Sequence, residues 1–468
     1  MQVDYLVVGA GATAMAFVDV ILSETEATVA IVDRRDAPGG HWNDAYPFVR
    51  LHQSSSFYGV PSAPLGQGRR QPDGINAGLP EMASKPEILH YYQELLEHRF
   101  LPTSRVAYYP QSEYLGEGRV RSLLTGEEIR LELRGKTVQA GRWGESTSIP
   151  ATHTPSFSIA PGVAFGPVND LARRAAHHES FTVIGAGKTG MDAICWLLGR
   201  GVDPERISWV RPNDYWLFNR DLIVPDPAFF VSTIKNQIAE MESLATASTV
   251  REHVKNLEAS GRWIRIDPNC WPTKFHAAVC SEAEVRAMRR ITNVIRMGHV
   301  LEISPEAIVL EDGRVPYADN RLFIDCTGRG GVILGPDAPP VFDGKEINTF
   351  MVRPFQPAFS AAFIAHLEAT IADDEEKNAL ARVTDFQDTP YQYMAVQLVG
   401  MANQHVWNQN PELRRWIESC RLNAGTHLMA GLSPSDTEKM ALLSQLGPLI
   451  GKAAQNLPRI IAAGDDAS

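Results

Sequence analysis

Residues 5–14 read Tyr-Leu-Val-Val-Gly-Ala-Gly-Ala-Thr-Ala, which indicates a strand, a tight turn and the start of a helix. The four apolar residues are too few for a helix and end at Gly9. Small residues then open an apolar helix that we expect to end near Ser23, and Val29–Val32 forms a second buried strand. Strand, helix and strand in this order make a right-handed βαβ unit, which implies a parallel sheet.

The turn has the spacing Gly9-x-Gly11-x-x-Ala14. The first glycine permits the tight turn, the second lets the backbone approach a pyrophosphate, and the third small residue lets helix and strand pack closely. The phosphates would lie at the helix N-terminus. Asp33 follows the second strand about 20 residues later, where a carboxylate accepts a ribose hydroxyl bond. These features predict a dinucleotide site; the alternative is a glycine turn that only connects the two elements.

The same pattern begins again at Phe181, with the full glycine set Gly185-x-Gly187-x-x-Gly190 and a returning strand at 207–210. This second strand ends in Arg211 rather than in an acid. A guanidinium suits a 2′-phosphate, which a carboxylate would repel, so NADPH is favoured over NADH.

The residues Lys188 and Thr189 at this turn add further hydrogen-bond donors. They superficially resemble the end of a Walker A motif, but Thr182 stands where that motif needs a glycine. A nucleoside triphosphate loop is therefore excluded.

The rest of the chain is expected to contain helices, strands and irregular segments. Residues 34–82 form an irregular region, 85–99 a helix, and 106–138 a small antiparallel meander. Helices are expected over 234–259 and 282–295, and a buried strand over 322–324. The last hundred residues are expected to be mostly helical.

Composition narrows the possible partners. The 468 residues include 44 Lys and Arg against 55 Asp and Glu, which gives a net charge of −11. This charge argues against nucleic acid and anionic membrane surfaces as partners. No secretory signal or apolar run of about 20 residues is found. Five scattered cysteines without C-x-x-C spacing indicate a reducing compartment, with the cytoplasm expected, and no metal-ligand spacing occurs.

The segment that follows Asp33 carries a family resemblance. Residues 39–47 read Gly-Gly-His-Trp-Asn-Asp-Ala-Tyr-Pro, with Arg50 three residues later. The segment resembles the G-G-x-W and Y-P stretch of flavin-containing monooxygenases and Baeyer–Villiger monooxygenases. The resemblance implies that the first dinucleotide is FAD, with Gly40 and Trp42 along its pyrophosphate and ribityl chain. Trp42 as an ordinary core residue is the alternative.

Three further stretches are similar to the same proteins. Trp216-x-x-x-Arg220 resembles the segment that contacts NADPH, although Arg220 alone could be an ordinary surface residue. Asp325-Cys-Thr-Gly328 resembles the A-T-G turn where the chain crosses back to the FAD domain. Gln356 opens an apolar helix that, in this resemblance, directs its N-terminus at the flavin; a merely packed helix is the alternative.

Two missing sequence features distinguish between the subfamilies of these flavoproteins. No cysteine pair lies in residues 39–60, which excludes a disulfide reductase. The motif F-x-G-x-x-x-H of class B monooxygenases is also missing, because residues 161–171 keep only Phe165-Gly166. That motif helps to hold NADP during oxygenation, so its absence leaves a reductase without oxygenation as an alternative.

His52 and Gln53 are the candidate catalytic residues, because they fall where these families place an Asn or Asp beside the flavin. A surface-loop position for His52 is the alternative, and His153, Lys274 and His276 are secondary candidates. The predicted cofactor contacts are Gly9, Gly11, Ala14, Asp33, Arg34, Gly40, His41, Trp42, Arg50, Thr327, Gly328 and Gln356 for FAD, and Gly185, Gly187, Lys188, Thr189, Gly190, Arg211 and Arg220 for NADPH.

The expected fold is α/β, with two Rossmann-like dinucleotide-binding domains and a helical C-terminal extension. The FAD domain is predicted over 1–160 and 321–370, the NADPH domain over 165–320, and the extension over 371–468, where it covers the cleft or forms a homo-oligomer interface. The expected function is NADPH- and FAD-dependent monooxygenation, with O₂, of a small organic substrate at nitrogen, sulfur or a carbonyl. The alternatives are an FAD oxidoreductase without oxygenation and a non-catalytic redox sensor.

Overall fold

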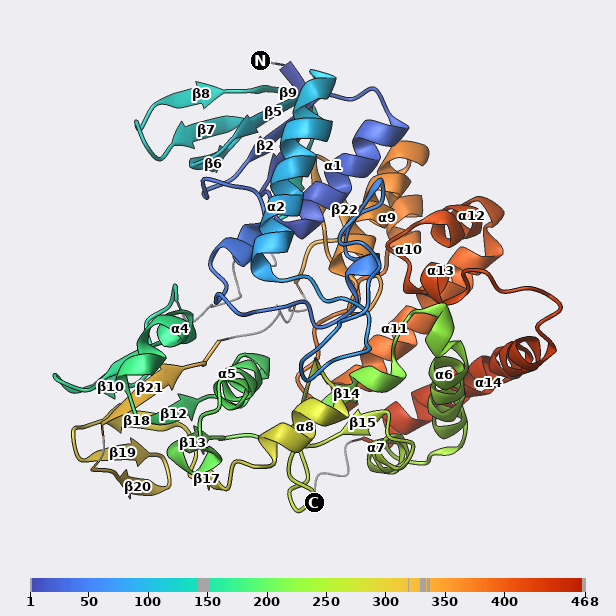
Figure 1. The fold of residues 1–468 in the computed structure, drawn as a ribbon. Coiled ribbons are helices and arrows are strands. Elements are labelled where there is room, and N and C mark those ends of the chain that lie inside the picture. The colour runs from blue at the N-terminus through green and yellow to red at the C-terminus, as the bar shows by residue number, and fades with distance from the viewer. Residues whose placement is uncertain (1, 142–150, 319, 329–333, 335–336, 465–468) are drawn as a thin grey trace.

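The computed structural model describes residues 2–141, 151–318, 320–328, 334 and 337–464. Small portions of the predicted domains lie outside the described residues. They are 1, 142–150, 329–333 and 335–336 of the predicted FAD domain, 465–468 of the predicted C-terminal extension, and residue 319 of the predicted NADPH domain. Two largely parallel sheets organise the chain, one at the top and one at the lower left of Figure 1.

The first sheet has the strand order β22-β23-β9-β1-β2-β5. Its strands are β1 Gln2–Val8, β2 Val29–Val32, β5 Val106–Tyr109, β9 Glu132–Gln139, β22 Phe342–Asp343 and β23 Glu346–Asn348. β1 runs parallel to both β2 and β9. Helix α1 (Ala12–Glu24) joins β1 to β2 and packs beside α9 (Pro357–Thr370), so the predicted βαβ unit is present.

The predicted antiparallel meander over 106–138 is only partly correct. β6 (Ser112–Gly116), β7 (Arg119–Ser122) and β8 (Glu128–Arg130) form it. The flanking strands β5 and β9 instead join the parallel sheet, because they carry buried apolar residues that pair with β2 and β1. Their neighbours in sequence did not reveal these long-range partners.

The second sheet has the order β11-β21-β12-β13-β17. Its strands are β11 Phe165–Pro167, β12 Ser180–Ile184, β13 Ile207–Val210, β17 Asn293–Ile295 and β21 Arg321–Asp325. All four pairings are parallel, and α5 (Lys188–Gly199) joins β12 to β13. The two sheets with their βαβ units establish the predicted α/β class with two Rossmann-like units.

One sequence expectation fails in this half, and the pairing of one strand bears on a proposed domain boundary. The helix predicted over 282–295 ends early, as α8 (Glu282–Met288), and β17 follows it in the sheet beside β13. The strand β21, predicted to begin the second part of the FAD domain, pairs with β12 along its whole length. The chain therefore leaves the second sheet only after Asp325.

Smaller elements surround these sheets. The helix predicted over 234–259 is two helices, α6 (Phe230–Thr246) and α7 (Val250–Ala259). The other elements are α2 Lys85–Leu95, α4 Leu171–Arg174, β3 Gly59–Val60, β4 Ala63–Pro64, β10 Ser158–Ile159, β14 Tyr215–Asn219, β15 Trp263–Ile264, β16 Lys274–Cys280, β18 Val300–Ile303, β19 Ala307–Leu310 and β20 Gly313–Pro316.

The C-terminal extension is helical, as predicted, and is built from α10 Asp374–Leu380, α11 Pro390–Gln409, α12 Pro411–Ser419, α13 Ala424–Leu428 and α14 Thr437–Ala462. α14 lies along α6, and α11 crosses the centre of the molecule beside both (Figure 1). An apolar cluster joins the extension to the β14–β16 sheet through Tyr393, Leu457, Trp263 and Phe275. Burial of such large apolar side chains stabilises each by about 1.5–3 kcal/mol, so the extension is integral to the fold.

One arginine of the extension also makes hydrogen bonds to the first half of the chain. Arg421 donates from its guanidinium to the backbone carbonyls of Ser56, Tyr58 and Val60. No helix in the described part of the chain has the length and apolar character needed to cross a membrane.

Candidate functional site

The first glycine turn lies at the carboxyl end of β1. Gly9 has φ +105°, a conformation that favours glycine, and the turn leads directly into α1 with no side chain capping the helix. Gly40 has φ +56°, and a Cβ there would lie 2.9 Å from the Gly11 Cα. The structure therefore brings together the two predicted FAD segments around an uncapped helix N-terminus, which is a suitable site for phosphate.

Asp33 and Ala14 support this turn from inside. The Asp33 carboxylate accepts hydrogen bonds from the backbone N–H groups of Ala10, at 2.5 Å, and Arg35, at 2.7 Å. Ala14 is fully buried in the helix–strand contact. Since a carboxylate has about four acceptor positions, Asp33 retains capacity for a ribose hydroxyl.

The other predicted FAD contacts of the 34–50 segment differ in exposure. Trp42 is buried and donates from Nε1 to the Tyr58 hydroxyl at 2.7 Å, whereas His41 is exposed. Arg34 forms a surface ion pair with Glu113 at 3.0 Å, and Arg50 donates to the Met82 carbonyl at 3.0 Å. These two arginines are thus engaged with protein groups away from the glycine turn.

The second glycine turn repeats the geometry of the first. Gly185 has φ +118°, and a Cβ there would lie 2.8 Å from the Cys326 carbonyl oxygen. A Cβ on Gly190 would collide with the Gly185 carbonyl oxygen, which also accepts a 2.9 Å hydrogen bond from Trp209 Nε1. Gly187 is the N-cap of α5 and offers no side-chain cap, and the space around its missing Cβ is open. The turn thus presents a free helix N-terminus to solvent.

Lys188 is turned inward rather than toward this open space. It forms an ion pair with Asp192, whose other oxygen accepts a 2.6 Å hydrogen bond from the Tyr46 hydroxyl. Burial opposes the charge on Lys188, but Asp192 raises its pKa above the ordinary value. Thr189 follows in the first turn of α5. Lys188 therefore links the second glycine turn to the 39–50 segment.

Arg211, at the end of β13, is buried with 3% of its surface exposed and stacks over the Trp209 ring at 4.7 Å. It forms an ion pair with Asp214, which also accepts from Arg296 Nε at 3.0 Å. Arg296 follows β17 and its side chain is 34% exposed. The sequence reasoning missed Arg296; the available signal was a second arginine directly after a strand, hidden by the wrong helix prediction.

Arg220 is a buried residue whose contacts connect the two halves of the chain. It pairs with Glu284 at 2.6 Å and donates to the carbonyls of His52, at 3.1 Å, and Val279, at 2.9 Å. The alternative that Arg220 is an ordinary surface residue is therefore wrong. The same contacts fix the backbone at the two candidate catalytic residues.

His52 and Gln53 lie in different surroundings. His52 is half-buried, and burial together with the charges of Lys188 and Arg220 lowers its pKa well below the ordinary value. The imidazole is therefore neutral at physiological pH. Gln53 lines a cavity of about 400 Å³, whereas His52 lines a small neighbouring pocket with Gln53, Met82 and Arg220.

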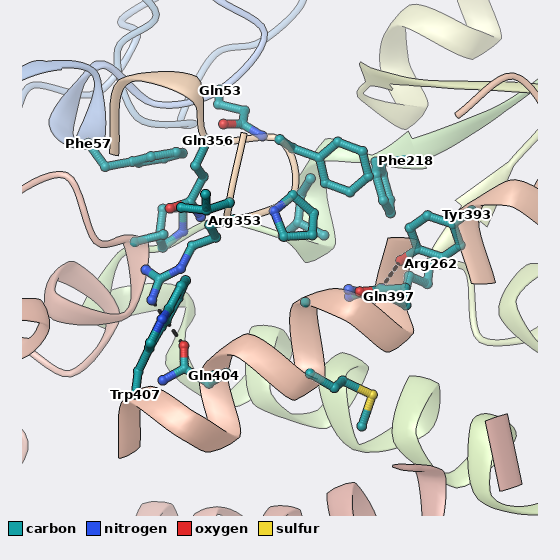
Figure 2. A pocket seen from close by; sticks show the side chains of 18 residues that line it. Gln53, Phe57, Phe218, Arg262, Arg353, Gln356, Tyr393, Gln397, Gln404 and Trp407 are labelled. Carbon is teal, nitrogen blue, oxygen red and sulfur yellow. Dashed lines mark hydrogen bonds between the residues drawn. The ribbon is translucent and has the colours of Figure 1, made fainter. Parts of the chain in front are cut away.

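The 400 Å³ cavity is bounded by the first half of the chain, by the segment before α9 and by α11 (Figure 2). Its walls are mainly aromatic or apolar, with several amides and two arginines. The lining residues are Gln53, Phe57, Phe218, Ile223, Pro225, Arg262, Val352, Arg353, Pro354, Phe355, Gln356, Tyr393, Gln397, Gly400, Met401, Gln404, Trp407 and Ala424. A cavity of this size and character fits a small organic ligand.

Gln356 is the predicted FAD contact that lies in this cavity wall. It precedes α9, and its buried Oε1 makes no hydrogen bond within the described residues. The lining residues from α11 were missed by sequence reasoning. Their signal is helical spacing, since Gln397, Gly400, Met401 and Gln404 recur at i, i+3, i+4 and i+7.

The remaining predicted residues lie outside the cavity. Thr327 donates from its backbone N–H and hydroxyl to Asp325, with His153 Nε2 3.4 Å from that hydroxyl; Gly328 is exposed beside them. Lys274 and His276 both pair with Asp388, just before α11. Within the part of the chain that the structure describes, no group of three or more His, Cys, Asp or Glu residues could hold a metal ion.

The fold and the two glycine turns define a protein with two dinucleotide-type βαβ units and a cavity covered by a helical extension. No protein-family model matches the chain. The chain is 38% identical over 465 residues to Uncharacterized protein Rv2000 of Mycobacterium tuberculosis and, equally, to Uncharacterized protein Mb2023 of Mycobacterium bovis. The alignment covers 99% of this chain and 85% of each relative. The chain belongs to the family of these mycobacterial proteins.

Several solved structures are also similar. The steroid monooxygenase bound to NADP shares 15% identity, with a TM-score of 0.48 over 100% of this chain and 99% of that one. The cyclohexanone monooxygenase from Rhodococcus sp. Phi1, bound to NADP⁺, shares 14% identity, with a TM-score of 0.45 over 98% of each chain. The bacillithiol disulfide reductase of Bacillus cereus shares 10% identity, with a TM-score of 0.46 over 80% of this chain and 100% of that one.

Proposed function

We propose that the protein is an NADPH- and FAD-dependent monooxygenase that acts on a small organic substrate. The observation that carries the proposal is the pair of glycine turns, each of which leads into an uncapped helix at the carboxyl end of a parallel strand. Two such turns in one chain fit two dinucleotides. The resemblance of the 39–50 segment to flavin-dependent monooxygenases supports FAD as the first of them.

Gly9, Gly11 and Gly40 would hold the FAD pyrophosphate, because Gly9 adopts φ +105° and the backbones at Gly11 and Gly40 approach too closely for a side chain on Gly40. Asp33 would accept the ribose hydroxyl. The proposed FAD domain covers residues 1–160 and 326–370, and the proposed NADPH domain covers 165–325, since β21 lies in the second sheet.

Gly185, Gly187 and Gly190 would hold the NADPH pyrophosphate at the start of α5. Arg211 and Arg296 share Asp214, so two guanidinium groups meet at the ends of β13 and β17. Arg296 is the more exposed of the two and would make the direct contact with a 2′-phosphate. The positive charge of the buried Arg211 would add to the attraction. Arg296 donates to Asp214 and Asp267 through Nε and Nη2, so a phosphate would bind its remaining donors. Such charge-assisted hydrogen bonds are strong.

The chemistry that the two cofactors supply when bound is hydride transfer and activation of O₂. The chain positions the substrate and excludes water through the aromatic walls of the cavity. Gln53 reaches the cavity with an amide that donates to a substrate or oxygen atom as negative charge develops. Because His52 is neutral, it adds no positive charge beside this amide.

The experiment begins with the purified full chain. We expect a yellow protein with one FAD, rapid anaerobic reduction by NADPH rather than NADH, and incorporation of ¹⁸O from ¹⁸O₂ into a thioether, amine or cyclic ketone from a substrate panel. Reduction followed by transfer only to an artificial acceptor, without ¹⁸O in any product, would support the oxidoreductase alternative, which the missing F-x-G-x-x-x-H motif favours. Bound FAD without NADPH turnover would support the redox sensor.

A further inference from the structure

Arg353 is a half-buried cation in the cavity wall. It lies between β23 and α9, and its guanidinium donates to Asn423 Oδ1 and Gln404 Oε1, both at 3.0 Å. It stacks over the Phe359 ring at 3.7 Å and lies 5.2 Å from the Trp407 ring. Figure 2 shows the group facing Gln404 beneath Gln356. No carboxylate among the described residues pairs with it.

Three other arginines, two of them buried and one on this cavity, have a carboxylate partner, whereas Arg421 has only the backbone carbonyls described above. Arg211 pairs with Asp214, Arg220 with Glu284, and Arg262, on the same cavity, with Glu240. A buried charge without an opposite charge is costly, because the protein interior solvates it less well than water does. Burial lowers the pKa of Arg353 only to about 10, so the group keeps its charge at neutral pH.

The cavity beside Arg353 provides the rest of a binding site. Phe57, Phe218, Phe355 and Met401 form apolar walls, and the unpartnered Gln356 Oε1 is available to a donor on a ligand. A single planar guanidinium matches a carboxylate in a bidentate pair. A phosphate ligand would be expected to meet more than one uncompensated cation, and the second cavity arginine is already paired with Glu240.

We propose that this cavity binds small apolar molecules that carry a carboxylate, and that Arg353 is the residue that recognises the carboxylate. The proposal rests on the proposed function in that it names the substrate class of the same cavity. The binding itself requires neither NADPH nor oxygen. A failure to bind is therefore distinguishable from a failure to oxygenate.

Isothermal titration calorimetry on the full chain as purified, with its bound cofactor, tests the proposal. The probes are phenylacetate, 3-phenylpropionate, 2-naphthoate and decanoate, each compared with its primary amide. We expect at least one acid to bind with a dissociation constant below 1 mM, and its amide to bind about tenfold more weakly or worse, since charge-assisted hydrogen bonds are about twice as strong as neutral ones. Absence of binding by every acid, or equal binding of acid and amide, would overturn the proposal.

Two variants assign the preference to Arg353. Arg353→Met removes the charge and should abolish the discrimination between acid and amide, whereas Arg353→Lys should keep part of it. The control is Arg105→Met, which removes another half-buried guanidinium that contacts only the end of α1 and the residues after it. Retention of the full preference in Arg353→Met, or its loss in Arg105→Met, contradicts the assignment. The acid–amide comparison on the wild type needs no variant to fold.

Discussion

Gly11 and Gly40 face each other so closely that a Cβ on Gly40 would lie 2.9 Å from the Gly11 Cα. Real Cβ atoms do not approach a backbone atom so closely, and neither segment is a flexible side chain that could yield. The contact joins the start of α1 to the segment that resembles the flavin-binding stretch. The position of one segment thus determines the position of the other.

The first prediction follows from this contact. Gly40→Ala adds a clash to the cost of a left-handed residue, which is about 1–3 kcal/mol. We expect the variant to separate the two segments, to lose most of its FAD and to unfold at a lower temperature. Absorbance at the flavin band and a thermal melt measure both effects.

Gly74→Ala is the matched control, because Gly74 has φ +78° but open space around its missing Cβ. It carries the same backbone strain without the clash. Stoichiometric FAD in Gly40→Ala, or equal FAD loss in both variants, would show that the Gly11–Gly40 contact does not shape a flavin site.

The second prediction separates the two arginines that share Asp214. Arg296→Ala should raise the KM for NADPH about ten- to a hundredfold, which corresponds to a lost charge-assisted contact of about 1.5–3 kcal/mol, and leave NADH unchanged. Arg211→Ala should also lower the melting temperature, since Arg211 is buried in its ion pair. Steady-state kinetics with both cofactors, alongside melts, provide the comparison. A wild type that prefers NADH, or equal effects on both cofactors, is the contrary result.

The third prediction concerns Gln53, which lines the large cavity. Gln53→Ala should leave the rate of flavin reduction intact and lower product formation by up to about 10²-fold, because an amide donor is lost where charge develops. Hydrogen peroxide release should rise in proportion. His52→Ala, which alters only the smaller pocket, should have a weaker effect. If product and peroxide are unchanged in Gln53→Ala, the reaction occurs elsewhere.

The fourth prediction uses His253, which is fully buried and hydrogen-bonded through Nδ1 to Ser243 at 2.8 Å. Burial, with help from Arg262, lowers its pKa to about 3. The unfolded chain, with a histidine pKa near 6.5, then binds more protons than the fold once the pH falls below that value. Stability is therefore lost on acidification, by about 2 kcal/mol from this residue at pH 5.

His253→Gln removes that term, so its free energy of unfolding should fall less than that of the wild type between pH 7 and pH 5. Urea melts at both pH values measure the difference. His98→Gln, at a position where the side chain is 65% exposed, should follow the wild type. Parallel pH profiles for His253→Gln and the wild type would be inconsistent with a neutral buried imidazole.

The two βαβ units were predictable because the signal is local. In each, a short apolar strand, a glycine turn and an apolar helix lie within a few residues of one another. The errors arose where long-range pairing decides the structure. Asn293–Ile295 has helical neighbours in sequence but is placed in the sheet by Ser208–Val210, and β21 belongs with β12 although its resemblance suggested the other half.

The cavity was only partly predictable for the same reason. Gln53 and Gln356 were found through motifs, whereas Arg353 and Gln404 belong to segments that carry none. Arg353 is also indistinguishable in sequence from an exposed arginine. Only the three-dimensional structure shows that it lies against two aromatic rings without a carboxylate partner among the described residues.

The bonds from Arg421 to Ser56, Tyr58 and Val60 have a consequence for the order in which the protein forms. The two partners lie up to 365 residues apart in the chain. At about 5–20 residues per second, the ribosome delivers Arg421 roughly 20–70 s after Ser56. The two glycine turns are complete before then, while α11 and the final wall of the cavity are still being synthesised. Both glycine turns of a nascent chain are therefore in place before the helices that complete the cavity, and the bonds from Arg421 to the first half of the chain can form only afterwards.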